Sequence, residues 1–154
     1  MRGHFYFFAY GASMNPVRLA SRTSDCEALG VGRLVGHRLA FHKRREDGEQ
    51  PAGEADAYRT GSPADEVFGA LYRVGSRERD ELDVAEGVGS GYRRVTGKVQ
   101  FDGRPVIADY YVAEAQWIAD NLQPYDWYLA LLSSGARVHA LPMAYQRMLR
   151  RIPT

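Results

Sequence analysis

The chain has few of the features that mark several broad classes of protein. Its single cysteine, Cys26, cannot form a disulfide within the chain, as is usual for proteins of the reducing cytoplasm. Its net charge of +1 gives no general attraction for nucleic acid or for an anionic membrane. Its apolar runs stay well short of the roughly 20 residues that a membrane span requires. We therefore expect a cytoplasmic protein that binds neither nucleic acid nor a membrane.

Signals for export and for metal binding are also weak. Residues 1–10 place Arg2 before an apolar stretch, but the stretch is short and aromatic, and no small-residue cleavage site follows it. The histidines form no cluster with the spacing of metal ligands, so we predict no metal site. These histidines are His4, His37, His42 and His139.

What remains is the composition of a small globular domain. The chain has 154 residues, of which 45% are hydrophobic and 25% are charged, and this suits one domain over residues 1–154. Its ten tyrosines are unusual. Because tyrosine combines an apolar ring with a polar tip, we expect most of them to pack in the core with the hydroxyl at the surface. Exposed tyrosines would also suit a homodimer interface.

Runs rich in aromatic or β-branched residues, bounded by turn-forming residues, predict strands. Asp102-Gly103 between two such runs is a strong signal for a hairpin. Residues 43–53 are polar with glycine and proline, so we expect a loop there. The expected strands cover residues 5–10, 28–42 (one long or bent strand), 55–59, 66–74, 92–101 and 104–112.

Four segments carry the start signals of helices. Asn15-Pro16 combines an N-cap with proline at the first helical position, and Ser76 is a second candidate N-cap. The expected helices cover residues 17–21, residues 77–85, a stretch from Pro124 to Gly135, and a last helix after Leu141-Pro142 with Ala144, Met148 and Ile152 on one face and Tyr145 and Leu149 beside them.

Strands and helices do not alternate regularly, which disfavours a doubly wound parallel sheet. We predict an α+β fold in which a mostly antiparallel sheet or small barrel is surrounded by helices.

The segment from Tyr10 to Met14 is the first candidate site. It leads from a predicted strand to a predicted helix start, and Gly11, Ala12 and Ser13 are small enough to let a ligand approach the backbone. Successive N–H groups in such a turn can bind a carboxylate or a phosphate. An ordinary strand-to-helix turn has the same pattern, so the residues alone leave both interpretations open.

Glu86 is the second candidate. It stands where a predicted helix runs into the glycine-rich segment 87–91, and a carboxylate held there can act as a general acid and base. An exposed glutamate at a helix end is the more common case. The glycine-rich segment lacks the lysine or downstream acid of a nucleotide-binding loop, so we interpret it as a flexible turn at the rim of a pocket.

Other reactive side chains lack a supporting pattern. Ser13 and Ser90 have no nucleophile-elbow sequence around them, and Cys26 has no companion motif. The basic run at residues 43–45 is interpreted as a solvated part of a loop.

Taken in order, these segments resemble the γ-glutamylcyclotransferase superfamily, which includes the AIG2-like proteins. Residues 8–14 look like its N-terminal loop of the Tyr-Gly-Ser-Asn type, and residues 82–91 look like its catalytic glutamate segment. Residues 65–72 are similar to the strand that precedes that segment. The chain around Tyr128, together with residues 135–146, is similar to its C-terminal helices. The matches span nearly the whole chain.

The resemblance implies a small mixed barrel with helices packed around it. It also implies an activity that releases the γ-glutamyl group of small γ-glutamyl amino acids or amines as 5-oxoproline, without a metal or cofactor. It places the catalytic carboxylate at Glu86 and a pocket tyrosine at Tyr128. The implied substrate-binding loop is Tyr10, Gly11, Ala12, Ser13 and Met14.

Two positions depart from the pattern of the superfamily. Ala12 stands where many members have serine, and Ser13 stands where many have asparagine. Backbone N–H contacts would survive both changes, whereas side-chain contacts and therefore the substrate preference are in question. The Glu-Gly-Val-x-Ser-Gly segment looks more like the members that act on γ-glutamyl amino acids, and a relative that removes a γ-glutamyl protecting group from a biosynthetic intermediate would be a close variant.

Two functions of different kinds fit these residues. An enzyme would use Glu86 to take a proton from the α-amine of the substrate and to give one to the leaving amine, which favours a carboxyl pKa above about 4.3. A non-catalytic module would keep the pocket to bind a γ-glutamyl metabolite or a partner protein, and the departures at Ala12 and Ser13 are its support.

Overall fold

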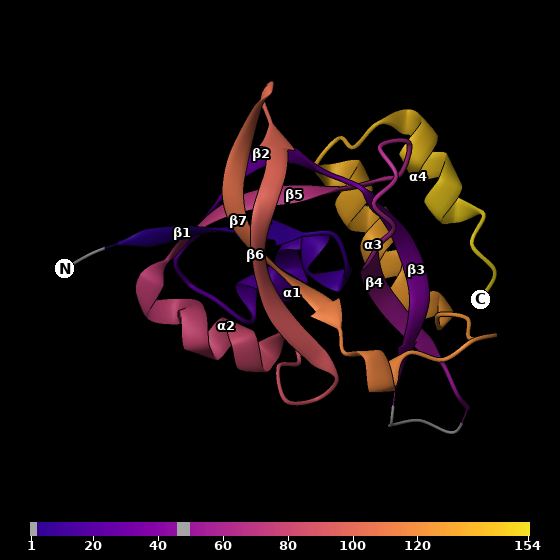
Figure 1. Cartoon of the computed structure of the whole chain (residues 1–154). Helices are drawn as coiled ribbons and strands as arrows, with labels where there is room; N and C mark the ends of the chain where they lie inside the picture. Colours follow the sequence, from indigo (N-terminus) through magenta and orange to yellow (C-terminus); the bar gives the residue numbers. More distant parts are fainter. Residues whose placement is uncertain (1–2, 46–49) are drawn as a thin grey trace.

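The computed structural model describes residues 3–45 and 50–154, and its centre is a closed barrel (Figure 1). The barrel strands are β1 (His4–Ala9), β2 (Cys26–Val35), β5 (Glu66–Gly75), β6 (Tyr92–Phe101) and β7 (Arg104–Ala113). In the described residues they follow one another in the order β1-β5-β2-β6-β7. Neighbouring strands are antiparallel except β1 and β7, which pair in parallel. The α+β fold with a mixed, mostly antiparallel barrel is thus confirmed.

The hairpin between β6 and β7 is also confirmed. Phe101 pairs with Arg104 across a two-residue turn, in which Asp102 (φ 52°) and Gly103 (φ 78°) both take positive φ. Turns of this kind match the right-handed twist of the flanking strands, which is why the Asp-Gly pair predicts them.

The single long strand expected over residues 28–42 is wrong, because the chain turns at Gly36. This glycine has a φ of 81°, and its N–H donates to the carbonyl of Asp65 while its own carbonyl accepts from Thr60. The chain therefore leaves the barrel after β2 and forms β3 (His37–Arg44). This strand pairs with β4 (Gly53–Arg59) in a separate two-stranded sheet within the described residues.

Strand β3 also extends into the segment expected to be a loop. Lys43 pairs with Glu54, and Arg44 pairs with Gly53. The expected loop is thus shorter at its N-terminal side than residues 43–53, and residues 46–49 lie outside the described part of the chain.

The helices lie on two sides of the barrel (Figure 1). The short α1 (Pro16–Ala20) follows a 3-10 turn over residues 12–14, and α2 (Arg79–Ala85) follows another over residues 76–78. Helices α3 (Asp126–Val138) and α4 (Met143–Arg150) lie together on the side of β3 and β4. The predicted cap at Asn15 is confirmed, because its side-chain oxygen accepts from the N–H of Arg18 at 3.1 Å.

Three details of the predicted helices are wrong. Ser76 does not cap α2 but opens the 3-10 turn before it, and the chain becomes α-helical only after Glu78. Helix α3 continues past Gly135, because that glycine is used for a close approach to the backbone of Met14 rather than for a helix end. On α4 the buried face carries Tyr145 and Leu149, whereas Ala144 is exposed.

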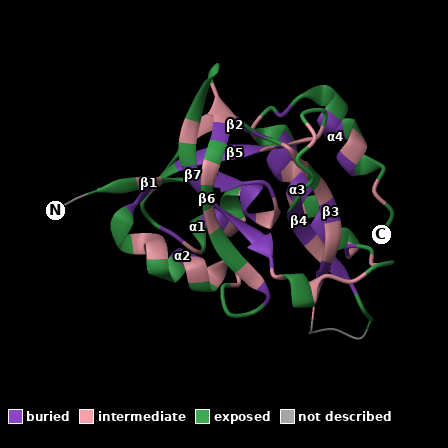
Figure 2. Cartoon of the chain, in the orientation of Figure 1, coloured by how far each residue is buried: buried purple, intermediate pink, exposed green. Residues whose placement is uncertain are grey.

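Buried residues, purple in Figure 2, run along the barrel strands and the inner side of α3, whereas α2 buries only one side chain, Leu82. The centre includes Phe8, Leu71, Leu132 and Leu149, each with none of its surface exposed. None of the helices in the described residues is both long and apolar enough to span a membrane.

Polar contacts fix α2 to the barrel. Asp83 on α2 accepts a hydrogen bond from the Tyr111 hydroxyl at 2.7 Å and pairs with Arg94 at 2.6 Å. At the other end of the helix, Arg79 pairs at 2.7 Å with Asp109, a carboxylate that is 3% exposed. Because α2 is held at both ends, the position of the residue that follows it is also fixed.

Candidate active site

A cavity of about 180 Å³ opens where the end of β1, α1, the end of α2, the β3–β4 sheet and α3 meet. It brings together segments that are more than 100 residues apart in the sequence. Its lining residues are Phe7, Phe8, Ala9, Tyr10, Gly11, Ala12, Ser13, Arg18, Arg22, Lys43, Glu54, Ala55, Ala85, Glu86, Gly87, Ser90, Tyr92, Tyr111 and Tyr128. Of the predicted site residues, only Met14 is missing from this lining.

Glu86 reaches the cavity because of the way α2 ends. Its backbone N–H closes the last turn of the helix by donating to Leu82 at 2.8 Å. The next residue, Gly87, has a φ of 95°, a conformation that side chains disfavour, and its carbonyl accepts from the N–H of Tyr92. The chain therefore reverses directly after Glu86 and enters β6, with the carboxylate facing the cavity.

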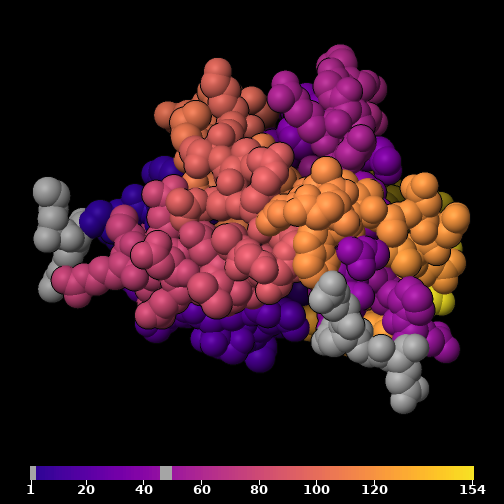
Figure 3. All heavy atoms as spheres, turned by 60° about the horizontal axis from the view of Figure 1, so that its bottom comes forward, coloured from indigo at the N-terminus to yellow at the C-terminus, as the bar shows by residue number. Residues whose placement is uncertain are grey.

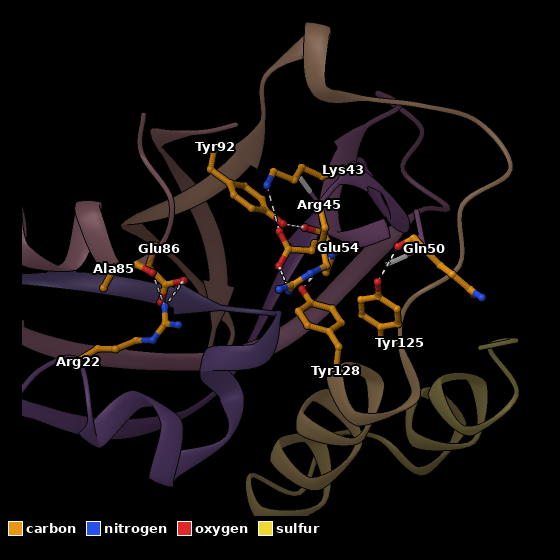
Figure 4. A network of polar contacts seen from close by, with 11 residues as sticks. Arg22, Lys43, Arg45, Gln50, Glu54, Ala85, Glu86, Tyr92, Tyr125 and Tyr128 are labelled. Carbon is orange, nitrogen blue, oxygen red and sulfur yellow. Dashed lines mark hydrogen bonds and ion pairs between the residues drawn. The ribbon is translucent and has the colours of Figure 1, made fainter. Parts of the chain in front are cut away.

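Two neighbours of the Glu86 carboxylate lower its pKa, whereas burial raises it. The Ser13 hydroxyl donates to Oε1 at 2.5 Å. Nη1 of Arg22 lies 3.8 Å from Oε2 (Figure 4). The side chain is 16% exposed. Burial raises the pKa of Glu86 above its usual 4.5, and the hydrogen bond from Ser13 and the charge of Arg22 offset only part of that rise. The result is a carboxyl that holds its proton to higher pH than an ordinary glutamate does.

The loop at residues 10–14 forms one wall of the cavity, with its last residue behind that wall. The Tyr10 hydroxyl donates to the carbonyl of Tyr111, and Gly11, Ala12 and Ser13 line the space. Met14 is completely buried in the core, and its N–H donates to the Gly11 carbonyl at 3.0 Å. Its N–H is thus used inside the turn, while the three preceding residues face the cavity.

Tyr128 contributes from α3 to the opposite wall. Its hydroxyl oxygen accepts from the N–H of Ala55 at 2.9 Å, and the hydroxyl of Tyr92 donates to the carbonyl of Ala55 at 2.6 Å. The two tyrosines therefore bond both backbone groups of the same residue of β4. Burial raises the pKa of both phenols, so both stay neutral. Because the Tyr128 oxygen accepts in this contact, its own proton remains available to a ligand.

The interpretation of residues 43–45 as a solvated loop is wrong for Lys43. Its side chain is 6% exposed, and Nζ lies 3.0 Å from Oε1 of Glu54, which Arg45 pairs from the other side at 2.9 Å (Figure 4). The ammonium also lies 4.9 Å from the ring centroid of Tyr92 and 4.8 Å from that of Trp117. The sequence carried no signal for this pair, because it depends on the register between β3 and β4.

Trp117 covers this end of the cavity from outside. The segment after β7 lies against the turn that follows α2, and the N–H of Glu114 donates to the carbonyl of Gly91 at 2.8 Å. Figure 3 shows the two segments side by side on one face of the molecule. Any side chain at Gly91 would collide with Trp117 and with Lys43, so the glycine permits this close cover.

Arg18 and Arg22 were also missed by the sequence analysis. Arg18 lies on α1 and Arg22 just beyond its end, and both guanidinium groups reach the cavity. Their spacing of four residues is typical of one helix face, which is the only signal they give. Nothing in that spacing tells whether the face meets solvent or a cavity.

The fold and the cavity have counterparts among known proteins. A solved structure of a γ-glutamyl cyclotransferase superimposes on the chain with a TM-score of 0.87 at 27% identity, covering 98% of this chain and 89% of that one. The curated γ-glutamylcyclotransferase of Homo sapiens is 28% identical over 150 residues, which are 96% of this chain and 78% of the relative. That of Bos taurus is 27% identical over 151 residues, with the same coverage.

The sequence model of the AIG2-like family matches residues 66–149, which are more than half of the chain. The chain therefore belongs to the AIG2-like family, within the γ-glutamylcyclotransferase superfamily. The resemblance drawn from the ordered sequence segments is confirmed.

Proposed function

We propose that this protein is a γ-glutamylcyclotransferase that releases 5-oxoproline from γ-glutamyl amino acids or related γ-glutamyl amides. The observation that carries the proposal is Glu86, a largely enclosed carboxylate of raised pKa that lines a cavity beside a loop of small residues. The names of the relatives at 27–28% identity support the same reaction.

The reaction needs little covalent chemistry from the protein. The α-amine of the substrate attacks its own γ-carbonyl carbon, a five-membered ring closes, and the bond to the leaving amine breaks. Because the nucleophile belongs to the substrate, the protein has to hold a bent conformer and move protons, and such orientation can supply several kcal/mol of the barrier. A small cavity suits that task.

Glu86 would carry a proton between the two nitrogens. As a carboxylate it takes a proton from the α-ammonium, which frees the amine to attack, and as a carboxylic acid it gives that proton to the leaving nitrogen. The second proton that the α-nitrogen loses on ring closure ends on the released amine, which departs as an ammonium. A pKa raised above 4.5 supports both steps, because the proton affinity then lies closer to the working pH. The hydrogen bond from Ser13 fixes Oε1 and leaves Oε2 on the side of Arg22.

The other lining residues would hold the substrate. The backbone of Gly11, Ala12 and Ser13 is suited to the γ-glutamyl group, since small side chains let a carboxylate approach the N–H groups. Tyr128 has a hydroxyl proton to offer, and it would stabilise the negative charge that develops on the γ-carbonyl oxygen.

Release of 5-oxoproline from a panel of γ-glutamyl amino acids and γ-glutamylamines tests the proposal. The variant Glu86→Gln keeps the shape of the side chain and its contact with Ser13 but cannot accept a proton, so we expect kcat to fall by about 10³-fold or more. Glu81→Gln is the matched control, because Glu81 is an exposed carboxylate on the same helix and should keep full activity. Ligand binding without any release of 5-oxoproline would contradict the enzyme and favour a binding module.

A further inference from the structure

Arg18 is a cation of the cavity whose side chain has no hydrogen-bond or ion-pair partner in the described part of the chain. It extends from α1 and lines the cavity, and it is half-buried. Its Nε is fully enclosed and has no hydrogen-bond partner among the described residues. Over residues 3–45 and 50–154 its guanidinium forms no ion pair either. An enclosed N–H without an acceptor is unfavourable, which is why such groups usually have a role.

The other cations of the cavity are already paired. Arg22 lies 3.8 Å from Glu86 and also donates to the carbonyl of Ala85, while Lys43 pairs with Glu54. The described lining therefore holds three cations and two carboxylates, and the excess positive charge belongs to Arg18.

The backbone at Arg18 is also fixed before any ligand arrives. The side chain of Asn15 caps the N–H of Arg18 and donates in turn to the Ser134 hydroxyl on α3 at 2.8 Å. Pro16 restricts the backbone at the start of the same helix. These contacts hold the backbone from which the Arg18 side chain extends, so the backbone has little freedom left to lose on binding.

We propose that Arg18 binds a carboxylate of the substrate and thereby selects anionic γ-glutamyl compounds. This proposal rests on the proposed function, which supplies the γ-glutamyl substrate. A carboxylate would neutralise the excess positive charge of the cavity lining. The two oxygens of a carboxylate also match the planar, forked shape of the guanidinium. Among γ-glutamyl amides, those with a cationic leaving group would meet the same excess positive charge and bind less well.

The carboxylate has two possible sources, which one experiment separates. It is either the α-carboxylate of the γ-glutamyl group, present in every substrate, or the carboxylate of a leaving amino acid. We would measure kcat and KM for γ-glutamyl-alanine and for γ-glutamyl-ethylamide, which lacks the second carboxylate. The variants are Arg18→Gln and Arg18→Lys, with Arg147→Gln as a control that removes an exposed charge from α4.

We expect Arg18→Gln to lower kcat/KM by about tenfold to a hundredfold, mainly through KM, as befits the loss of a charge-assisted contact. Arg18→Lys should recover part of the loss, and Arg147→Gln should match the wild type. Equal losses on both substrates identify the α-carboxylate, whereas a loss on γ-glutamyl-alanine alone identifies the leaving group. Values within twofold of the wild type on both substrates would overturn the proposal.

Two further readouts separate this claim from the proposed reaction and from a merely structural role. Calorimetric titration of γ-glutamyl-alanine into the Glu86→Gln protein, with and without Arg18→Gln, reports binding even if no 5-oxoproline is ever released. An equal Kd for the two proteins would overturn the role of Arg18 alone. Thermal unfolding should show Arg18→Gln to be at least as stable as the wild type, since it removes an unpartnered group; a large loss of stability together with unchanged binding would assign Arg18 a structural role instead.

Discussion

At the scale of the single residue, placing the Glu86 carboxylate in the cavity lowers the stability of the folded protein. Burial disfavours the ionised form by more than Ser13, Arg22 and Arg18 favour it. Groups of this kind are typical of functional sites, where a perturbed pKa is retained although a neutral side chain would fold more easily.

Glu86→Gln should therefore stabilise the protein at neutral pH. The pKa of Glu86 is raised in the folded state, so folding favours the protonated form, and the stability contributed by that form is lost as the pH rises above the usual 4.5 through the folded pKa. We expect the Tm of the variant to exceed that of the wild type at pH 7.5, with the difference shrinking toward pH 4. A gain of about 2–4 °C would correspond to roughly 1 kcal/mol for a chain of this size. An equal or lower Tm at pH 7.5 would show that the ionised carboxylate is not disfavoured.

Ser13 should tune the pH at which Glu86 works. Its hydrogen bond lowers the carboxyl pKa, so Ser13→Ala should raise that pKa and move the acidic limb of the kcat/KM profile to higher pH. Ser90→Ala is the control, because Ser90 also lines the cavity but makes no hydrogen bond to Glu86 in the described part of the chain. An acidic limb that stays in place in Ser13→Ala would mean that another group sets it.

At the scale of the element, sequence patterns predicted the structures that adjacent residues determine, but not those that depend on distant partners. The Asp102-Gly103 hairpin and the cap at Asn15 follow from the conformations of two or three adjacent residues, and both are confirmed. The turn at Gly36 was missed, because a glycine inside a strand-like run fits a bulge as well as a turn. The choice is made by distant partners such as Asp65.

The same limit explains what was missed in the site. Glu86 and the loop at residues 10–13 could be singled out, since each adjoins a recognisable helix boundary. Lys43 and Glu54 could not, because their pairing depends on the register of two strands joined by a polar segment. The basic run at residues 43–45 therefore predicted a solvated segment, although the Lys43 side chain is buried.

The strand pair β3–β4 should lose stability when Lys43 is neutralised. Lys43→Met leaves Arg45 as the ion-pair partner of Glu54 in the described residues and removes the ammonium from between two aromatic rings, so we expect a loss of about 1–3 kcal/mol in the free energy of unfolding. Urea unfolding would measure it. The double variant Lys43→Met with Glu54→Gln should recover part of the loss, because no carboxylate is then left with a missing partner. Wild-type stability in the single variant would contradict a structural role for the pair.

At the scale of the whole molecule, the cavity exists only when the barrel and its helices are assembled. Its polar groups come from the loop after β1, from α1 and α2, from the β3–β4 sheet and from α3. The sequence could place these segments in the order typical of a superfamily, but it could not say which side chains meet. That information comes from closure of the barrel, which brings Ser13 to Glu86 and Tyr128 to Ala55.

The measurement that tests the central claim most directly is the stoichiometry of products from γ-glutamyl-alanine at a single pH near neutrality. The account predicts one 5-oxoproline for each free alanine with the wild-type protein, and neither product above background with Glu86→Gln. Release of alanine together with glutamate would show hydrolysis by water instead of cyclisation, and full 5-oxoproline release by Glu86→Gln would show that this carboxylate does not carry the protons. Either result would contradict the account.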